Sequence, residues 1–302
     1  MKNVVCFGEV LWDILPSGRK PGGAPMNVAY HLRRLGVESY IVSRVGNDIY
    51  GEELKALLVG MGLSTTYVQT DTVYKTSEVI ATPSKNNEML YEIVKPVAWD
   101  FITADEDNHS LIKQADMFVF GSLVARNDVT RETLFTLLDQ ARFKLFDVNF
   151  RPPHYTRDLI EYLLKKADAV KLNEGELAII GSWLADKKET ASESIARIQD
   201  HYQLAEIIVT KGGEGASYYT LNERYDYQAY PIEIKDTVGS GDSFLAAFIA
   251  QKLLGKPIDD ILDYAAALGA YVTSQDGANP DYRLTDLNRF IWEKKLERAK
   301  WK

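Results

Sequence analysis

The sequence predicts an α/β fold in which a mostly parallel sheet is covered by helices on both faces. Two observations carry this prediction. Short apolar runs that do not alternate with polar residues occur at 117–120, 145–148, 169–172 and 207–210. Amphipathic stretches separate them at 130–142, 158–166 and 192–201. Continuous apolar strands that alternate with helices are typical of strands buried on both sides. We expect ligands at the carboxyl ends of these strands.

The composition bounds the size of the fold and excludes several classes of function. The chain has 302 residues, of which 46% are hydrophobic, so one large domain or two small ones can form a full core. The net charge is −8 and there is no basic block, which argues against nucleic acid or a membrane surface as partner. No apolar run is long enough to cross a bilayer, and the first residues carry no cleavage-type signal. We therefore expect a cytoplasmic protein.

The N-terminal region predicts a strand, a glycine turn and a helix. The apolar run at 4–10 is a candidate buried strand, and 11–16 continues it with Asp13 embedded among large apolar residues. A glycine pair then leads into a helix that starts near Pro25 and stops at Gly36. Proline in the first helical turn and glycine after the last turn are favoured positions.

The next region changes from helical to strand periodicity. Residues 41–51 predict a strand, a turn and the start of a helix. Helical spacing disappears between 67 and 97, where two loosely alternating stretches, 76–82 and 88–94, are separated by 83–87. This pattern indicates a hairpin. It could form the edge of the main sheet or a separate small sheet, and the surrounding α/β elements favour the separate sheet.

The stretch 236–249 runs from a polar glycine turn directly into an apolar helix that stops near Gly255. Gly239 and Gly241 allow backbone N–H groups to face a ligand, and a helix N-terminus favours an anion. The carboxylate of Asp242 would repel that anion, so an aspartate at this position needs an explanation. It is explained if Asp242 accepts a proton from a nucleophile that attacks the anion. The alternative interpretation is that Asp242 caps the helix.

Three further polar strings follow predicted strands. Asp147, Asn149 and Arg151 alternate, so we expect them to point to one side, as a structural network or as part of a site. An Asn-x-x-Glu string at 173–176 suits a helix start. A glycine-rich turn at 209–215 is typical of nucleotide contacts and of hairpins, and it does not match the Walker pattern.

Two of these strings resemble the signatures of the PfkB (ribokinase-like) family of sugar kinases. D-T-V-G-S-G-D at 236–242 is similar to the second signature, D-T-x-G-A-G-D, with Ser240 in the place where alanine is commoner. G-G-x-x-x-N at 22–27 resembles the first signature. The resemblance implies one kinase domain over 1–302, a ribokinase-like three-layer α/β/α sandwich. It also implies a small β-sheet lid, formed mainly by about 67–97 plus part of 11–20.

The resemblance implies a role for each candidate residue. Asp242 would be the catalytic base, and the anion hole would consist of Gly239, Ser240 and Gly241. The sugar would bind to Asp13, Gly22, Gly23, Asn27 and Arg151. The nucleotide would bind along Asn173, Glu176, Thr210, Lys211, Gly212, Gly213, Gly215, Asp236, Thr237 and Asn279. Glu176 would also hold Mg²⁺ through water.

The implied activity is transfer of the γ-phosphate of ATP, with Mg²⁺, to a primary hydroxyl of a sugar. G-G-A-P-x-N at 22–27 and its short lead-in look like bacterial fructokinases, so fructose is the expected substrate. 2-Keto-3-deoxygluconate, ribose and a nucleoside are the alternatives. A non-catalytic sugar-binding regulator and a plain nucleotide hydrolase are rivals, although the intact Asp242 favours a kinase. A K⁺ site near the loop 275–280 and a homodimer through the lid are left open.

Overall fold

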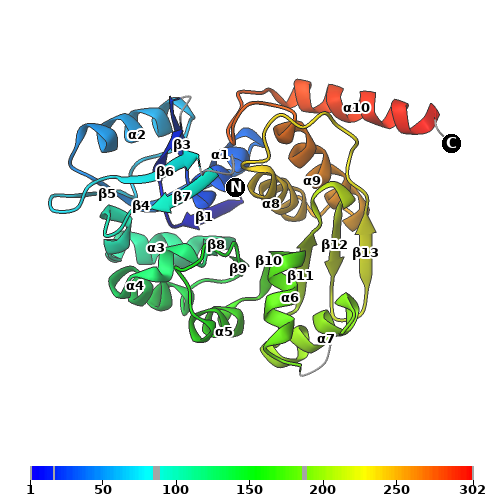
Figure 1. Ribbon diagram of the computed structural model, residues 1–302, viewed down its shortest axis with the longest axis horizontal. Helices are drawn as coiled ribbons and strands as arrows, with labels where there is room; N and C mark the ends of the chain where they lie inside the picture. Colours follow the sequence, from blue (N-terminus) through cyan, green and yellow to red (C-terminus); the bar gives the residue numbers. More distant parts are fainter. Residues whose placement is uncertain (1, 16–17, 84–88, 186–188, 301–302) are drawn as a thin grey trace.

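The computed structural model describes residues 2–15, 18–83, 89–185 and 189–300. Within these residues, nine strands form a central sheet between two layers of helices (Figure 1). Seven neighbouring strands are parallel and two at one edge are antiparallel. The strand order is β13 (Arg224–Tyr227), β12 (Ala216–Tyr219), β11 (Glu206–Thr210), β10 (Ala169–Asn173), β9 (Lys144–Asp147), β8 (Met117–Gly121), β1 (Asn3–Phe7), β4 (Glu38–Gly46) and β5 (Val68–Asp71). The predicted α/β class with a mostly parallel sheet is confirmed.

The central strands are apolar throughout because both of their faces are buried. In β1, Val4 and Cys6 belong to one hydrophobic core, whereas Val5 and Phe7 belong to the core on the opposite face. All four side chains are fully buried. A strand covered on both sides gains from apolar residues at every position, which explains the runs without alternation.

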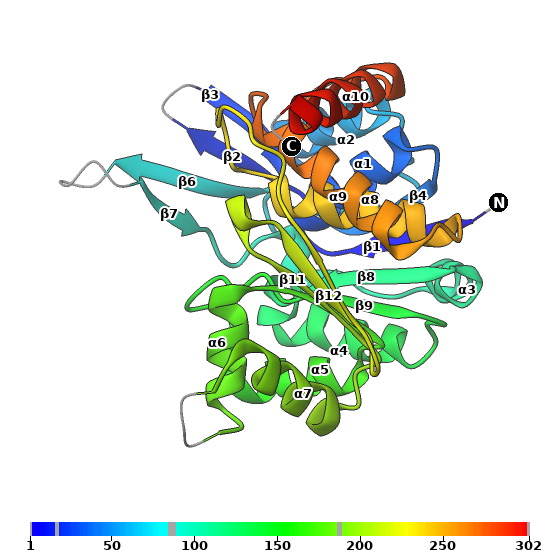
Figure 2. The same cartoon turned by 90° about the vertical axis from the view of Figure 1, so that its right-hand side faces the viewer.

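The helices divide into two layers (Figure 2). The layer that covers the face of Val4 consists of α1 (Ala24–Arg34), α2 (Ile49–Gly60), α8 (Ser240–Leu253) and α9 (Ile258–Thr273), with α10 (Leu284–Lys300) packed outside α9. The opposite layer consists of α3 (Glu106–Gln114), α4 (Asp128–Leu138), α5 (Arg157–Lys166), α6 (Glu174–Ser182) and α7 (Ala191–Tyr202). Short 3₁₀ turns occupy Ala98–Phe101, Leu123–Arg126 and Gly212–Glu214. No helix within the described residues is both long and apolar enough to span a bilayer.

A second, four-stranded sheet projects from the carboxyl edge of the central sheet (Figure 2). Its order is β3 (Gly18–Gly22), β2 (Leu11–Leu15), β6 (Ser77–Pro83) and β7 (Met89–Ile93). The hairpin prediction is confirmed, although most of the separating stretch 83–87 lies outside the described residues. The hairpin belongs to the separate sheet, so the interpretation as an edge of the main sheet is wrong. One part of 67–97, the strand β5, does not belong to the small sheet as expected. It pairs in parallel with β4 and forms one edge of the central sheet.

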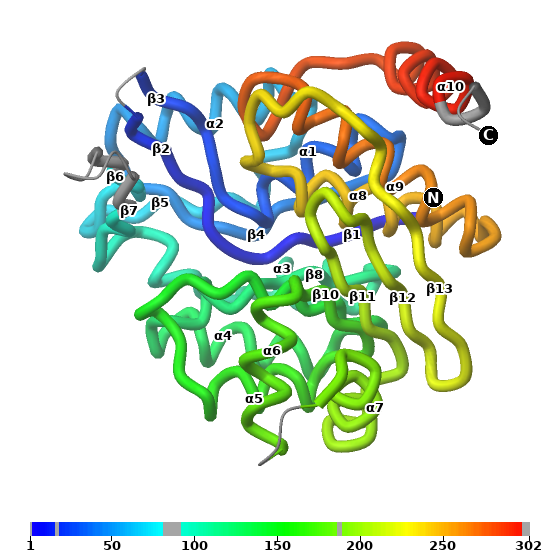
Figure 3. Tube along the Cα trace, turned by 45° about the vertical axis from the view of Figure 1, so that its right-hand side comes forward, coloured from blue at the N-terminus to red at the C-terminus, as the bar shows by residue number. Residues whose placement is uncertain are grey.

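Two connecting segments, one near each end of the chain, lie at the same edge of the central sheet. The glycine turn at the end of β3 leads into α1, which starts with Pro25 in its first turn and is followed by Gly36 at a φ of 81°. At the other end of the chain, residues 228–239 return from the edge strand β13 to the start of α8 (Figure 3). Because α1 packs against α8, the two glycine turns lie at the same edge of the sheet.

Candidate active site

Two cavities lie at the carboxyl edge of the central sheet, and both reach the first turn of α8. The first has a volume of about 520 Å³, and Gly239 and Asp242 are part of its wall. The second has a volume of about 490 Å³, and Ser240 and Gly241 are part of its wall. Thr237 lines both. Ligands in the two cavities would therefore meet at this turn.

The turn before α8 presents backbone donors because it contains a left-handed glycine. Gly239 is the N-cap residue of α8, with a φ of 76°, and no side chain caps this helix. A Cβ at Gly239 would lie 2.5 Å from the Cβ of Ala278, so only glycine fits. The N–H groups of a first helical turn lack partners within the helix, and the helix dipole is positive there. The turn is thus suited to hold an anion.

Asp242 lies in this first turn, but the structure does not bear out the capping alternative. Its Oδ2 accepts a hydrogen bond from Asn27 Nδ2 at 2.7 Å, and the helix has no side-chain cap bond. Burial raises the pKa of Asp242, the Lys171 ammonium opposes this shift, and the Asp147 carboxylate adds to it. A carboxylate with a raised pKa at the meeting point of two cavities is suited to accept a proton.

Most residues expected to bind the sugar line the first cavity. They are Asp13, Gly23, Asn27 and Arg151. Gly22 lies behind this wall, where a Cβ would be only 2.3 Å from Asp13 Oδ2, so its role is to let the Asp13 carboxylate pack closely. Burial raises the pKa of Asp13 to about 6. The cavity therefore combines carboxyl, amide and guanidinium groups, the functional groups that bind sugar hydroxyls.

Asn279, which we expected beside the nucleotide, instead contacts Asn27 in the wall of the first cavity. Its Nδ2 donates to Asn27 Oδ1 at 2.8 Å. The same loop is fixed to α1 by the fully buried His31, whose Nε2 lies 2.9 Å from the carbonyl oxygen of Ala278 and whose Nδ1 lies 3.0 Å from the Tyr282 hydroxyl. Burial lowers the pKa of His31 to about 4, so its ring is neutral near pH 7. This contact spans most of the chain length and has no local sequence signal.

The residues expected to bind the nucleotide are only partly brought together. The second cavity is lined by Thr210, Gly212, Gly213, Gly215, Thr237, Ser240 and Gly241. Lys211 is separate from this wall, because its Nζ lies 3.6 Å from Asp226 in an ion pair. Asp236 lines the first cavity, and its carboxylate accepts hydrogen bonds from the backbone N–H groups of Val238 and Gly277. The second cavity thus combines a glycine-rich wall with apolar side chains such as Tyr230, Ile232 and Phe244.

Glu176 and Asn173 form a capping box at the start of α6. Glu176 Oε1 accepts from the N–H of Phe150 and Oε2 accepts from the N–H of Asn173, both at 2.8 Å. Each oxygen retains a further lone pair, so the buried carboxylate fits a Mg²⁺ ion held through water. Within the described ranges, no group of three or more His, Cys, Asp and Glu side chains could hold a metal.

Two charged residues at the site were not predicted from the sequence. Glu9 is 5% exposed and lines the first cavity. Lys171 is 8% exposed and forms an ion pair with Asp147. Both stand in or directly after an otherwise apolar, buried strand. A charge in such a run is rarely tolerated without a partner or a function, and this signal could have identified them.

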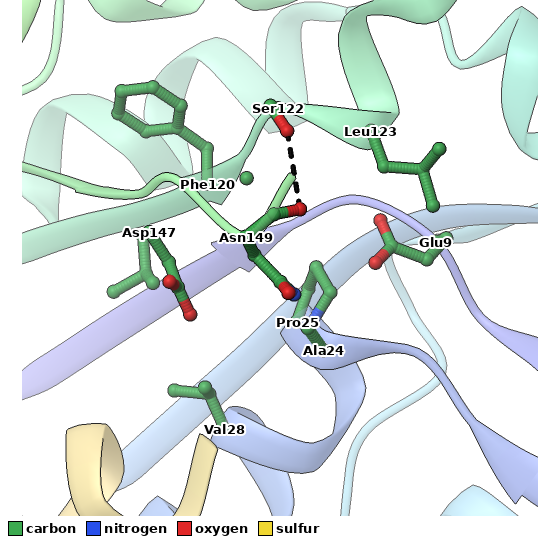
Figure 4. A pocket seen from close by; sticks show the side chains of 11 residues that line it. Glu9, Ala24, Pro25, Val28, Phe120, Ser122, Leu123, Asp147 and Asn149 are labelled. Carbon is green, nitrogen blue, oxygen red and sulfur yellow. Dashed lines mark hydrogen bonds between the residues drawn. The ribbon is translucent and has the colours of Figure 1, made fainter. Parts of the chain in front are cut away.

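Glu9 also faces a small hole of about 10 Å³ beneath the first cavity. Figure 4 shows Glu9 and Asn149 arranged around Ala24 and Pro25 at the start of α1. Glu9 Oε2 has no hydrogen-bond partner within the described residues, and the hole has room for about one water molecule. Burial raises the pKa of Glu9 to about 7.

The raised pKa of Glu9 predicts a pH-dependent stability. A carboxyl group whose pKa is higher in the folded state stabilises the fold below its unfolded pKa, and this contribution is lost as pH rises through the folded value. Between pH 5 and pH 8 the free energy of unfolding should fall by about 3 kcal/mol more in the wild type than in Glu9→Gln. Urea unfolding of both proteins at the two pH values measures this difference. Equal losses would show that Glu9 titrates normally.

Two cavities meet at a helix N-terminus that is suited to hold an anion, above a parallel sheet. A small-molecule phosphotransferase requires this arrangement, because its two substrates must meet at the transferred phosphoryl group. The sequence matches "pfkB family carbohydrate kinase" over residues 1–283. The chain belongs to the pfkB family of carbohydrate kinases.

Individual relatives agree with this family. The chain is 30% identical to the Arabidopsis thaliana protein named "Probable fructokinase-5", over 92% of this chain and 93% of that one. It is 29% identical to a fructokinase of Klebsiella pneumoniae, over 90% and 93% of the two chains. The crystal structure of a fructokinase with bound ATP from Xylella fastidiosa has the same fold, with a TM-score of 0.85 at 23% identity over 97% of this chain and 99% of that chain. The predicted ribokinase-like α/β/α fold is confirmed.

Proposed function

We propose that this protein is an ATP-dependent fructokinase, which transfers the γ-phosphoryl group of ATP to a primary hydroxyl of fructose. The observation that carries the proposal is the position of Asp242, in the first turn of α8 where the two cavities meet. We take the chain to act as one catalytic domain, with the four-stranded sheet as a lid over the sugar. The fructokinase names of the relatives at 29–30% identity support this choice of sugar.

In this proposal the first cavity binds the sugar. Asp13, Asn27 and the Gly23 backbone form hydrogen bonds with vicinal hydroxyls, and the Arg151 guanidinium donates further hydrogen bonds to the sugar. Apolar side chains of the lid cover the sugar and exclude water, which suppresses hydrolysis of ATP.

The second cavity binds ATP along its glycine-lined wall. Asp242 accepts the proton of the attacking hydroxyl, so that the oxygen–phosphorus bond forms as ADP leaves. The N–H groups of Gly239, Ser240 and Gly241 stabilise the charge on the transferred phosphoryl oxygens. Asn173 and Glu176 would hold Mg²⁺ through water, and the ion supplies positive charge to the phosphates when bound.

The charge of the first cavity supports a neutral sugar. Its wall contains the four carboxyl groups of Glu9, Asp13, Asp236 and Asp242, but only two cations, Lys20 and Arg151. Lys20 Nζ already lies 3.9 Å from Asp236 Oδ2. Glu9, with a pKa raised to about 7, is only partly ionised near pH 7, but the three aspartates still outnumber the two cations. A carboxylate or phosphate on the sugar would therefore enter a cavity with excess carboxyl groups. This disfavours 2-keto-3-deoxygluconate and fructose 6-phosphate relative to fructose.

A panel of acceptors tests the proposal. We expect ADP production with Mg²⁺-ATP to be fastest with fructose, with kcat/KM about a hundredfold lower for 2-keto-3-deoxygluconate and fructose 6-phosphate because of charge repulsion. Ribose and adenosine complete the panel, and assays with and without K⁺ test the monovalent ion. ADP release without sugar would indicate a nucleotide hydrolase. No ADP with any sugar would indicate a sugar-binding regulator.

Two further parts of the proposal concern the cell and the assembly. We place the protein in the cytoplasm, and we propose a homodimer that pairs through the lid. Among the residues that the structure describes, the outer strands of the lid, β3 and β7, each pair on one side only, and such edges favour pairing with a second strand. The molar mass of the protein in solution tests the dimer.

A further inference from the structure

An ion pair between Lys171 and Asp147 lies directly beneath the first turn of α8. Lys171 Nζ is 2.9 Å from Asp147 Oδ1 and 3.0 Å from Oδ2. The two residues stand opposite each other on the parallel strands β10 and β9, and their side chains are 10% and 6% exposed. The pair is therefore fixed by the sheet and shielded from solvent.

The ammonium group is packed against the proposed anion hole. A Cβ built at Gly241 would lie 3.1 Å from Lys171 Nζ and 3.7 Å from its Cε. A cation at this place is unfavourable for the helix, since the N-terminal end of α8 is already positive. A buried ion pair contributes little net stability compared with apolar residues of similar volume. Stability alone thus gives no reason for a lysine at this position.

The charged groups around Asp242 offer an explanation for the lysine at position 171. Four charged groups influence its pKa: Lys171 on β10, whose ammonium group lies against the neighbouring Gly241, Asp147 on β9, Arg151 in the loop after β9, and Glu9 in the loop after β1. Burial raises the pKa of Asp242, and Lys171 is the strongest influence in the opposite direction. Arg151 also opposes the shift, but it is exposed and more strongly screened by solvent.

We propose that Lys171 is a positioning residue for phosphoryl transfer: its ammonium group, fixed by Asp147 against Gly241, holds Asp242 in the carboxylate form that accepts the proton of the sugar hydroxyl. This inference rests on the proposed role of Asp242 as the base. Asp147 has the complementary role, because it fixes the ammonium group and also limits how strongly Lys171 acts on Asp242.

The test compares the pH dependence of kcat/KM for fructose in Lys171→Met, Asp147→Asn and the wild type. Removing the cation should raise the pH at which activity is lost on the acid side by about one to three units. Removing the anion should lower that pH, because Asp147 raises the pKa of Asp242. A pair that only stabilises the sheet would lower the rate in both variants by a similar factor at every pH. The opposite directions of the two shifts are therefore diagnostic.

Two controls distinguish the possible outcomes of this test. Thermal unfolding and calorimetric binding of fructose show whether each variant is folded, and Asp147→Asn alone tests the inference if Lys171→Met does not fold. Unchanged acid limbs in the variants, together with an inactive Asp242→Asn, would overturn the role of Lys171 and leave the proposed function intact. An active Asp242→Asn would overturn the base itself, and the role of Lys171 with it.

Discussion

Replacing Asp242 with asparagine is expected to lower kcat by about 10² to 10⁴, the contribution of a positioned general base. Asparagine has the same shape as aspartate, and its amide oxygen can still accept the hydrogen bond that Asn27 Nδ2 donates. Fructose binding should therefore change little, so the loss falls on the chemical step. Steady-state assays of ADP formation give kcat, and calorimetry gives the affinity for fructose.

Asp105→Asn is the matched control for this substitution. Asp105 is a true N-cap residue, whose carboxylate accepts from the N–H of Asn108 at the start of α3. The control removes the same charge from a helix N-terminus on the opposite layer, and it should leave kcat unchanged. If Asp242→Asn retained most of its rate, Asp242 could not be the base, and the assignment of the whole site would fail.

The sequence predicted those parts of the site that depend on local chemistry. A glycine turn that enters an apolar helix is recognisable from a few adjacent residues, and both such turns are found where they were expected. The α/β class was predictable for a related reason: the apolar runs of the central strands reflect burial on two faces. The first strand of the 67–97 segment was placed wrongly, because a four-residue edge strand carries too little pattern to show which sheet it joins.

The alternating polar residues at 147–151 show why sequence spacing alone did not predict their contacts. Three polar residues in extended conformation would point to one side, but Asn149 has a φ of 40°, which turns the backbone. Asp147 pairs with Lys171 on the neighbouring strand and lines the small hole with Asn149, whereas Asn149 and Arg151 line the first cavity. The string therefore joins an ion pair to residues that line the first cavity. The partner of a buried charge depends on the neighbouring strand, and a single strand's sequence does not contain that information.

Gly239→Ala should be the most damaging substitution outside the base. A Cβ at this position would lie 2.5 Å from Ala278 Cβ and 2.7 Å from Ala278 Cα, so the turn or the facing loop must move. Movement of the turn displaces the N–H groups that we propose to stabilise the phosphoryl oxygens, and loss of such a donor costs about 10² to 10³ in kcat. The loop that contains Ala278 also holds His31, so the melting temperature should fall as well.

Gly255→Ala, at the other end of the same helix, is the matched control. It separates the effect of backbone strain from the effect of displacing the turn before α8. Gly255 is also left-handed, with a φ of 67°, but a Cβ there would have no neighbour within 4 Å. Both variants carry the backbone strain of about 1–2 kcal/mol that a left-handed alanine incurs, whereas only Gly239→Ala forces the turn to move. We therefore expect Gly255→Ala to lose stability and retain kcat. If both variants kept their rate, the transferred phosphoryl group would have to be stabilised elsewhere, since Gly239→Ala must move the turn beside Asp242 and Gly255→Ala need not.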